Sequence, residues 1–549
     1  MLAQTTLPSD AASAYDYIIV GGGTAGCVLA SRLTEYLPHI KVLVIEGGPT
    51  DQNEERVLDL RQWLSLLESD LDYDYGTTEQ PMGNSHIRHS RAKVLGGCSS
   101  HNTLISFRPF KQDMDRWQRK GCKGWDFDMM MRMADKLKNT IQPIHERHRN
   151  QVVKDWVKAC RDALDIPLIE DFNKEIKGKG RITKGAGFFS IAYNPETWKR
   201  SSASVAYIHP ILEGVESRPN LTVVTEAWVS KVLVENDTAV GVDVTLKSGE
   251  KMTLKPRKEV ILSAGAVDTP RLMLHSGLGP RGQLEGLGIP VKKDIPGVGE
   301  NLTDHPETII IWRLKDPIPK NKTVMDSDAG IFLRREPINA AGDDGDATDL
   351  MMHCYQIPFT VNTERLGYPT IPDGYAFCMT PNIPRSRSRG RLFLTSADPA
   401  VKPSLDFRYF TDPEGYDAAT LVAGIRAARK VAQQSPFKER LLEEVCPGPK
   451  VQSDEDISLY ARKVAHTVYH PAGTTRMGDI ERDHLAVVDP QLRVRGINKL
   501  RIVDAGVFPD LPSPNPMVTV LSVAERAAEI IAMENGMQQR QFLDTKASL

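Results

Sequence analysis

The stretch YDYIIVGGGTAGCVLASRL, residues 15–33, decides the fold. It begins with Tyr17–Val20, a continuous apolar run of the kind found in strands buried on both faces. Gly21, Gly23 and Gly26 follow in the spacing G-x-G-x-x-G, and a helical pattern comes directly after them. Glycines at this place let a pyrophosphate approach the start of a helix. The stretch therefore predicts a dinucleotide-binding βαβ unit.

The next apolar run, VLVIEGG at 42–48, reads as a second strand and carries Glu46 near its end. Dinucleotide-binding units place an acid for the ribose hydroxyls about twenty positions after the last glycine, and Glu46 lies at that distance. A glycine turn that only packs a helix on a sheet is the alternative. The cofactor-binding residues predicted from this unit are Gly21, Gly23, Thr24, Ala25, Gly26 and Glu46.

The bulk composition limits the function classes. A chain of 549 residues is too long to form a single hydrophobic core, so we expect two domains. The net charge of −2 provides no overall field for nucleic acid or anionic lipid. The basic run RSRSRGR, residues 385–391, is expected to be a solvated or anion-pairing turn rather than a nucleic-acid site. The seven cysteines lack paired spacing, which predicts free thiols and no metal site.

Targeting signals are faint at both ends of the chain. The N-terminus lacks the basic and apolar regions of a secretory signal, and no segment approaches the roughly 18 apolar residues of a membrane span. The last three residues, Ala-Ser-Leu, are only distantly similar to the peroxisomal address Ser-Lys-Leu. We expect no membrane association and a cytoplasmic location, with the peroxisome as the weaker alternative.

Several other segments carry clear secondary-structure patterns. Residues 259–277 and 500–532 each read as a strand that runs through small or proline-rich residues into a helix. Residues 221–246 alternate like antiparallel strands, and residues 173–189 read as a basic, glycine-bearing loop. The part from about 310 to 460 is rich in strand patterns, which predicts a second domain.

Three further motifs carry residues suited to chemistry: RAKVLGGCSSHN (91–102), DHPET (304–308) and VYHPAGTTRMG (468–478). Together with GAVDTPRLMLHSGLGP (265–280) and PGVGENLTDH (296–305), they resemble the glucose–methanol–choline (GMC) family of flavin oxidoreductases over nearly the full length of the chain. The resemblance implies an α/β fold with a doubly wound, Rossmann-like FAD-binding domain and a smaller α+β substrate domain that contains an antiparallel sheet.

The domain limits that follow from this resemblance are discontinuous. Residues 1–161, 203–306 and 467–549 would form the FAD-binding domain, and residues 162–202 and 307–466 the substrate-binding domain. The family resemblance also implies a homodimer. Within the family, the segments RQWLSLLES, IPFTVNTERLGYPT and TVYHP are most similar to choline-oxidising members. They imply an FAD-dependent alcohol oxidase that takes choline through betaine aldehyde to glycine betaine and reduces O₂ to H₂O₂.

The resemblance assigns the cofactor FAD and a special role to His101. In the choline-oxidising members the matching histidine is bonded covalently to the flavin ring, and small neighbouring residues let its loop lie against that ring. A hydrogen-bonded histidine beside a non-covalent flavin is the alternative. The further cofactor-binding residues implied are Gly97, Ser100, Asn102, Thr103, Val229, Asp504, Ala505, Asn515 and Pro516.

The implied catalytic residues are His470, His353 and Asn515. An alcohol releases hydride readily only after its hydroxyl proton is removed or its alkoxide is stabilised. A histidine suits proton removal near neutral pH, so His470 is assigned that role. His353 and Asn515 are expected to form hydrogen bonds to the same oxygen. For each residue the alternative is a buried polar side chain with a structural partner.

Glu307, Trp63 and Tyr469 are the implied substrate-binding residues. A quaternary ammonium cannot donate a strong hydrogen bond, so it requires a negative charge and aromatic faces. A salt bridge from Glu307 to a neighbouring arginine is the alternative. The choline-oxidising members have one more tryptophan wall before the strand matching 329–333, but residues 321–330, NKTVMDSDAG, contain no aromatic residue. This departure predicts a cage that is open on that side.

Other functions remain compatible with the sequence. One is a GMC oxidase or dehydrogenase for another primary or amino alcohol, such as a choline dehydrogenase. Another is a catalytically silent flavoprotein that serves only in binding. An NAD-dependent dehydrogenase fits the glycine motif alone, but the segments beyond the first βαβ unit follow the flavin pattern.

Overall fold

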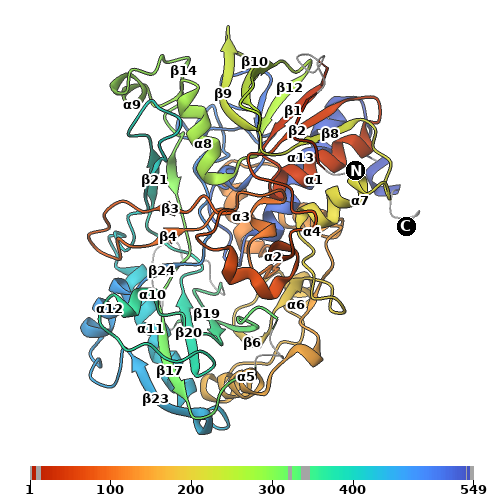
Figure 1. Cartoon of the computed structure of the whole chain (residues 1–549). Coiled ribbons are helices and arrows are strands. Elements are labelled where there is room, and N and C mark those ends of the chain that lie inside the picture. The colour runs from red at the N-terminus through yellow and green to blue at the C-terminus, as the bar shows by residue number, and fades with distance from the viewer. Residues whose placement is uncertain (1–2, 8–13, 320–323, 336–346, 540, 545–549) are drawn as a thin grey trace.

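The computed structural model describes residues 3–7, 14–319, 324–335, 347–539 and 541–544. Two large sheets dominate the molecule. A parallel sheet lies at one end and an antiparallel sheet at the other, and helices surround both (Figure 1).

The parallel sheet has five strands in the order β25-β12-β1-β2-β8. Its central strand β1 pairs in parallel with a strand on each side, Tyr17 opposite both Val42 and Glu259. Every residue of β1 and β2 is buried, which accounts for their continuous apolar sequences. The strand bounds are Tyr17–Val20 (β1), Val42–Ile45 (β2), Leu221–Val224 (β8), Glu259–Leu262 (β12) and Leu500–Ile502 (β25).

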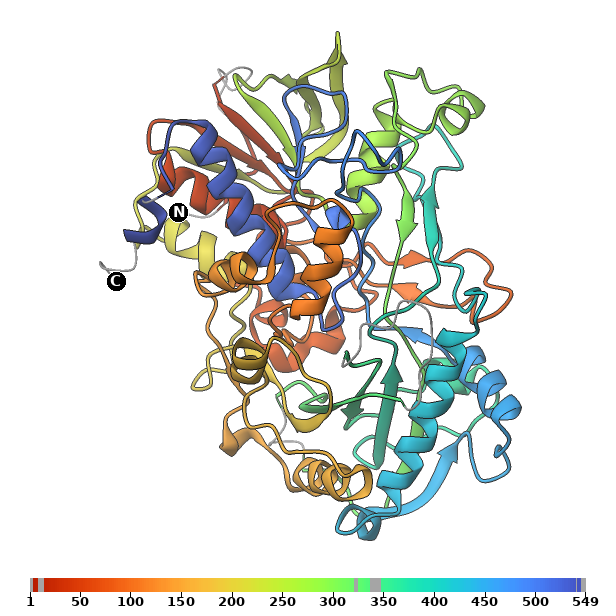
Figure 2. The ribbon, with the colours of Figure 1, turned by 180° about the vertical axis from the view of Figure 1, so that it is seen from behind.

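Two helices from opposite ends of the sequence pack together beside this sheet. Figure 2 shows α1 (Thr24–Tyr36) next to α13 (Met517–Glu534), which joins the end of the chain to its start. The turn into α1 requires glycine, because a Cβ on Gly26 would lie 2.0 Å from the carbonyl oxygen of Gly21. Helix α8 (Gly265–His275) follows β12 in the same strand–turn–helix arrangement.

The antiparallel sheet has eight strands, six of them in the order β23-β17-β20-β19-β18-β6; β16 pairs with β20, and β24 pairs with β16. Helix α11 (Tyr416–Ala432) packs on β19 and β20. The strand bounds are Gly185–Phe188 (β6), Pro306–Glu307 (β16), Ile310–Leu314 (β17), Ala329–Leu333 (β18), Leu350–Tyr355 (β19), Ala376–Asn382 (β20), Leu441–Cys446 (β23) and His466–Thr467 (β24).

A smaller sheet packs beside the parallel sheet (Figure 1). A three-stranded antiparallel sheet, order β11-β10-β9, contacts β12 through β10. Its bounds are Trp228–Glu235 (β9), Thr238–Thr245 (β10) and Lys251–Leu254 (β11).

The remaining elements are helices and short strands outside these sheets. They are α2 (Glu55–Leu58), η2 (Leu60–Leu66), β3 (Tyr75–Gly76), β4 (Arg88–His89), η3 (Gly97–Ser100), α3 (Lys111–Arg119), α4 (Phe127–Ala134), β5 (Ile141–Pro143), η4 (Glu146–His148), α5 (Gln151–Leu164), α6 (Phe172–Lys179), β7 (Ser190–Ala192), η5 (Ser204–Ile208), α7 (His209–Leu212), β13 (Leu278–Gly279), α9 (Arg281–Gly286), β14 (Lys293–Asp294), β15 (Glu300–Leu302), α10 (Val361–Glu364), β21 (Gly390–Phe393), β22 (Ser404–Asp406), η7 (Phe437–Arg440), α12 (Asp454–Lys463), η8 (Ala505–Val507) and α14 (Gln541–Asp544).

The fold class expected from the sequence is confirmed: a Rossmann-like parallel unit and a second unit with an antiparallel sheet. All five parallel strands fall within the segments expected for the FAD-binding domain. The domain limits themselves stay a prediction. None of the helices in the described part of the chain has the length and apolar character that crossing a bilayer requires. The C-terminal Ala-Ser-Leu lies outside the described residues.

Two local predictions were wrong. Residues 173–189 are not a loop, because α6 fills the first half and β6 follows. Asp171 caps α6 by accepting hydrogen bonds from the backbone N–H groups of Asn173 and Lys174, and Gly180 ends it with a positive φ. Residues 221–224 belong to the parallel sheet as β8, not to the antiparallel strands that follow them.

The basic turn at 385–391 pairs with acids, as expected. Arg387 forms an ion pair with Glu414, and Arg389 forms one with Asp510. Arg387 also lies over the ring of Tyr416, 4.0 Å from its centroid. The positive charges of this turn are therefore partly compensated within the molecule.

Candidate active site

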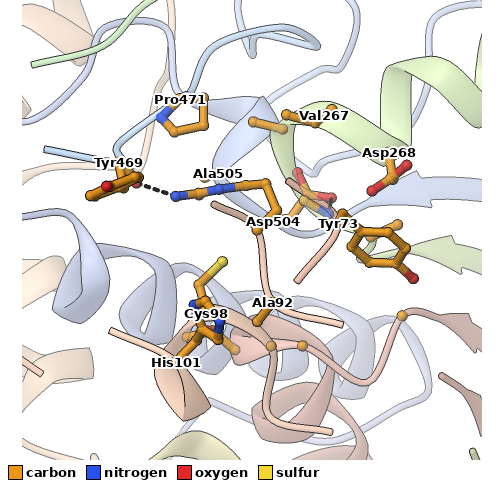
Figure 3. A pocket seen from close by; sticks show the side chains of 18 of the residues that line it. Tyr73, Ala92, Cys98, His101, Val267, Asp268, Tyr469, Pro471, Asp504 and Ala505 are labelled. Carbon is orange, nitrogen blue, oxygen red and sulfur yellow. Dashed lines mark hydrogen bonds between the residues drawn. The ribbon is translucent and has the colours of Figure 1, made fainter. Parts of the chain in front are cut away.

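A long cavity runs from the glycine turn before α1 to the end of β19. Its lining includes Gly21 at the parallel sheet and His353 at the antiparallel sheet. Figure 3 views it with Tyr469 towards one side and Tyr73 towards the other, and with His101 below. The cavity therefore brings together residues from both large sheets.

The end of the cavity near the parallel sheet is a backbone cradle. A Cβ on Gly97 would lie 2.7 Å from the Cα of Gly23, and Gly97 has a φ of +55°. The first residues of α1 line the cavity here, at the positive end of the helix dipole. Glu46 accepts backbone hydrogen bonds from Gly22 and Gly48, both at 2.8 Å, and burial raises its pKa to about 7.

Asp504 organises the opposite side of this end. Its carboxylate accepts hydrogen bonds from the backbone N–H of Gly265 at 3.0 Å, the hydroxyl of Thr269 at 2.7 Å and the N–H of Gly506 at 2.7 Å. Burial raises the pKa of Asp504 to about 6. Asp504 and the following Ala505 both line the cavity.

The histidine loop packs tightly against the cavity. Gly96 has a φ of +88°, and a Cβ there would lie 2.1 Å from the Ser100 hydroxyl oxygen. His101 Nε2 lies 2.8 Å from the carbonyl oxygen of Leu66, so this nitrogen is the donor, and Nδ1 lies 3.2 Å from the Ser90 hydroxyl. Burial lowers the pKa of His101 to about 4, so the imidazole is neutral at physiological pH.

Ser100 supports this loop from behind the cavity. Its hydroxyl donates to the Leu95 carbonyl at 2.8 Å and lies 3.2 Å from the hydroxyl of Ser204. Asp51 accepts from Ser204 and pairs with His209 Nε2 at 2.8 Å. All these hydroxyl groups are buried. The network fixes the loop that carries His101.

The turn at 468–471 adopts a conformation that the surrounding structure enforces. Tyr469 has a φ of +63°, which is uncommon for a residue other than glycine. The Arg91 guanidinium donates to its carbonyl oxygen (dashed line in Figure 3), and the Thr467 hydroxyl accepts from its N–H at 2.7 Å. Asp304 accepts from the backbone N–H of His470 at 3.0 Å. The side chains of Tyr469 and His470 thereby line the cavity.

A second histidine sets the tautomer of His470. His305 Nε2 donates to the Pro384 carbonyl at 3.1 Å, so a neutral His305 has its lone pair on Nδ1. His305 Nδ1 and His470 Nδ1 are 2.9 Å apart, and His470 must therefore be the donor in this pair. Burial lowers the pKa of His305 to about 4 and that of His470 well below its ordinary value. His470 is thus held as a neutral imidazole whose Nε2 can accept a proton.

His353 offers unused hydrogen-bonding capacity to the cavity. It is 1% exposed, and neither ring nitrogen has a hydrogen-bond partner within the described residues. Burial lowers its pKa to about 3. A buried imidazole without partners is costly, and a ligand oxygen in the cavity would remove that cost. Asn515 lines the cavity as well.

Glu307 is a buried acid that pairs with no cation among the described residues. It is 2% exposed, and its Oε2 has no hydrogen-bond partner in that part of the chain. No arginine or lysine of the described residues forms an ion pair with it. Burial and the charge of Asp304 raise its pKa well above the ordinary value. Glu307 does not line the cavity, but it lies close to two tyrosines that do. After burial, its charge is the largest influence that raises the pKa of the Tyr355 and Tyr469 hydroxyls.

Family models described as GMC oxidoreductase match residues 15–307 and 386–524. The chain belongs to the GMC oxidoreductase family. It is 41% identical to a choline oxidase from Arthrobacter globiformis, with 94% of each chain covered. It is 34% identical to an oxygen-dependent choline dehydrogenase from Staphylococcus xylosus, again over 94% of each. A solved pyridoxine 4-oxidase from Mesorbium loti has the same fold, with a TM-score of 0.83, 24% identity and coverage of 94% of this chain and 98% of that one.

GMC oxidoreductases bind FAD, and the residues present fit this cofactor. The cradle at Gly23 and Gly97 admits a pyrophosphate at the start of α1. Glu46 lines the cavity at the end of β2, and its carboxylate oxygens have further lone pairs for ribose hydroxyls. The described residues contain no group of three or more His, Cys, Asp or Glu that could hold a metal ion, and the seven cysteines are unpaired.

The structure gathers most of the expected site residues in this one cavity. Three of them do not line it: Gly26 packs against the carbonyl of Gly21, Ser100 donates to the Leu95 carbonyl within the histidine loop, and Glu307 is buried close to Tyr355 and Tyr469. The expected residues that line it are Gly21, Gly23, Thr24, Ala25, Glu46, Trp63, Gly97, His101, Asn102, Thr103, Val229, His353, Tyr469, His470, Asp504, Ala505, Asn515 and Pro516.

Three residues that shape the site were not predicted from the sequence: Arg91, His305 and Tyr355. Both Arg91 and His305 stand inside motifs that resemble the family: Arg91 is the first residue of the motif at 91–102, and His305 stands two positions before Glu307. Position alone did not reveal that they contact Tyr469 and His470, which lie far away in the sequence. Tyr355 follows His353 by two positions on β19, which was the available signal.

Proposed function

We propose that this flavin-dependent oxidoreductase is an alcohol oxidase that converts choline through betaine aldehyde to glycine betaine and reduces O₂ to H₂O₂. The observation that carries the proposal is the buried, cation-free carboxylate of Glu307 beside aromatic rings that line the cavity. A permanently charged, methylated nitrogen suits this environment, because it cannot satisfy hydrogen-bond acceptors but attracts anions and ring faces.

The side chains divide the chemistry among them. His470 Nε2 accepts the hydroxyl proton of the alcohol, and its partner His305 holds the required tautomer. His353 and Asn515 stabilise the alkoxide through hydrogen bonds. Bound FAD supplies the acceptor for the hydride that leaves the carbinol carbon. For the second oxidation the aldehyde adds water, and the resulting diol offers a new hydroxyl proton to the same histidine.

The purified protein should be yellow and should form H₂O₂ when choline is added in air. Oxygen consumption and peroxide are measured together, with tetramethylammonium as an unreactive competitor. Bleaching of the yellow colour by choline without reoxidation by O₂ would favour the dehydrogenase alternative. Reaction with neutral alcohols but not with choline would contradict the proposed substrate, and a colourless protein active with NAD would contradict the flavin assignment.

We also propose that His101 is the site of covalent flavin attachment. Supporting this, His101 lines the cavity and its imidazole is neutral, as a nucleophilic nitrogen must be. In the structure Nε2 donates to the Leu66 carbonyl, so the lone pair of the neutral imidazole is on Nδ1, and attack through Nε2 would require loss of that hydrogen bond and a change of tautomer. After acid precipitation the yellow colour of the wild-type protein should remain in the pellet, whereas in His101→Asn it should move to the supernatant. Free flavin from the wild-type protein would contradict the assignment.

A further inference from the structure

Tyr355 ends β19 and shares one face of that strand with His353. Residues two apart on a strand point to the same side, and the two rings have centroids 6.3 Å apart. Both side chains line the cavity. The tyrosine ring is therefore presented to the same space as the histidine to which we assign the substrate oxygen.

A continuous arc of rings links Tyr355 with Tyr469. Tyr355 stacks on Phe359 with centroids 5.6 Å apart and an interplanar angle of 12°. Phe359 lies 5.2 Å from the ring of His466, and His466 Nε2 lies 3.0 Å from the Tyr469 hydroxyl. Tyr355, Phe359 and Tyr469 all line the cavity. The stack limits the movement of Tyr355, so its ring has little entropy to lose when a ligand binds.

Glu307 lies close to both ends of this arc. After burial, the charge of Glu307 is the main cause that raises the pKa of Tyr355 and of Tyr469, and the nearby hydroxyl of Ser327 opposes the rise at Tyr355. Both phenols therefore stay neutral at physiological pH. The stretch that contains Ser327 has no aromatic residue of its own, so at this place the ring comes from β19 instead.

We propose that Tyr355 is an aromatic wall of the ammonium site and a determinant of specificity for methylated ammonium alcohols. This inference rests on the proposed function. Glu307 supplies the negative charge, and the faces of Tyr355 and Tyr469 contact the methyl groups of the cation. Attraction between a cation and a ring face depends on the ring quadrupole and is largest when water is excluded. The expected open side of the cage is therefore closed by a residue from another strand.

The test compares Tyr355→Leu with Tyr355→Phe in the FAD-loaded protein. The substrates are choline and its uncharged isostere 3,3-dimethylbutan-1-ol, and the binding of tetramethylammonium is followed by calorimetry. We expect Tyr355→Leu to lower kcat/KM for choline about tenfold and to weaken tetramethylammonium binding by a similar factor, which corresponds to a cation–ring contact in a desolvated site. In Tyr355→Leu, kcat/KM for the uncharged isostere should change much less. In Tyr355→Phe, kcat/KM for both substrates and the affinity for tetramethylammonium should stay within about twofold of the wild type, because the ring face is kept.

If Tyr355→Leu lowered kcat/KM for choline and for the isostere by the same factor, the inference would be overturned, because equal losses indicate lost packing rather than lost attraction to the cation. Unchanged tetramethylammonium binding in Tyr355→Leu would overturn it as well. If that variant fails to retain FAD, a fluorinated phenylalanine at position 355 keeps the ring shape and weakens the quadrupole, and choline affinity should then fall with each added fluorine. A wild-type protein that neither oxidises choline nor binds tetramethylammonium would refute the proposed function. If the wild type oxidises choline and Tyr355→Leu leaves kcat/KM for choline and tetramethylammonium binding unchanged, this inference alone is refuted.

Discussion

Replacing His470 by alanine should lower kcat with choline about a thousandfold, within the range that a positioned general base contributes. The reason is the fixed proton arrangement: His305 accepts from His470 Nδ1, which leaves Nε2 of His470 as the proton acceptor in the cavity. The binding of tetramethylammonium should change little, because Glu307 and the aromatic lining are untouched. Steady-state kinetics and calorimetry on the FAD-loaded variant measure the two effects separately.

His305→Ala is the informative companion of this variant. His305 does not line the cavity, so its loss should act through His470 and cost less than the loss of His470 itself. Without the partner on Nδ1, the His470 ring can adopt the other tautomer, and the pH profile of kcat should shift relative to the wild type. A His470→Ala variant that keeps more than about a tenth of wild-type turnover would contradict the assignment of the base.

The sequence was most informative where function and local structure share a short segment. The glycine turn before α1, the strand at 42–45 and Glu46 lie within 30 residues, and their spacing is dictated by one βαβ unit. The geometry of this first βαβ unit could therefore be predicted before any tertiary contact was known.

Contacts between distant segments could not be predicted in the same way. The His305–His470 pair spans 165 residues, and its geometry depends on the β16–β24 pairing that places the two motifs side by side. The Ser100 hydroxyl also lies 3.2 Å from that of Ser204, which belongs to another segment. Residues 173–189 were misread because their lysines and glycines are typical of loops, while the Asp171 cap and burial of Phe172 and Ile176 favour a helix.

Glu307 does not line the cavity, but it is buried close to Tyr355 and Tyr469, which do. A carboxylate at this position would attract a cation in the cavity across surroundings from which water is largely excluded. Charges interact more strongly there than at a surface. The charge and the rings should therefore act together on a methylated ammonium group and contribute little to an uncharged alcohol.

Glu307→Gln should raise KM for choline at least about a hundredfold, since losing the charge partner of a desolvated cation costs about 3 kcal/mol or more. KM for 3,3-dimethylbutan-1-ol should change little, because this alcohol carries no charge. The exposed Glu443 on β23 provides a matched control, and Glu443→Gln should leave KM unchanged for both substrates. A variant at Glu307 with ordinary choline affinity would contradict the proposed ammonium site.

The same residue should make choline binding depend on pH. Burial, and then the charge of Asp304, raise the pKa of Glu307 in the free protein, and choline binds its charged form. Binding therefore requires loss of a proton, so KM for choline should rise as the pH falls through the pKa of Glu307. KM for the uncharged isostere should not rise with it, and Glu307→Gln should abolish the difference between the two substrates. A parallel rise of both KM values in the wild type would assign the titration to another group, because only a step that depends on the cation can come from Glu307.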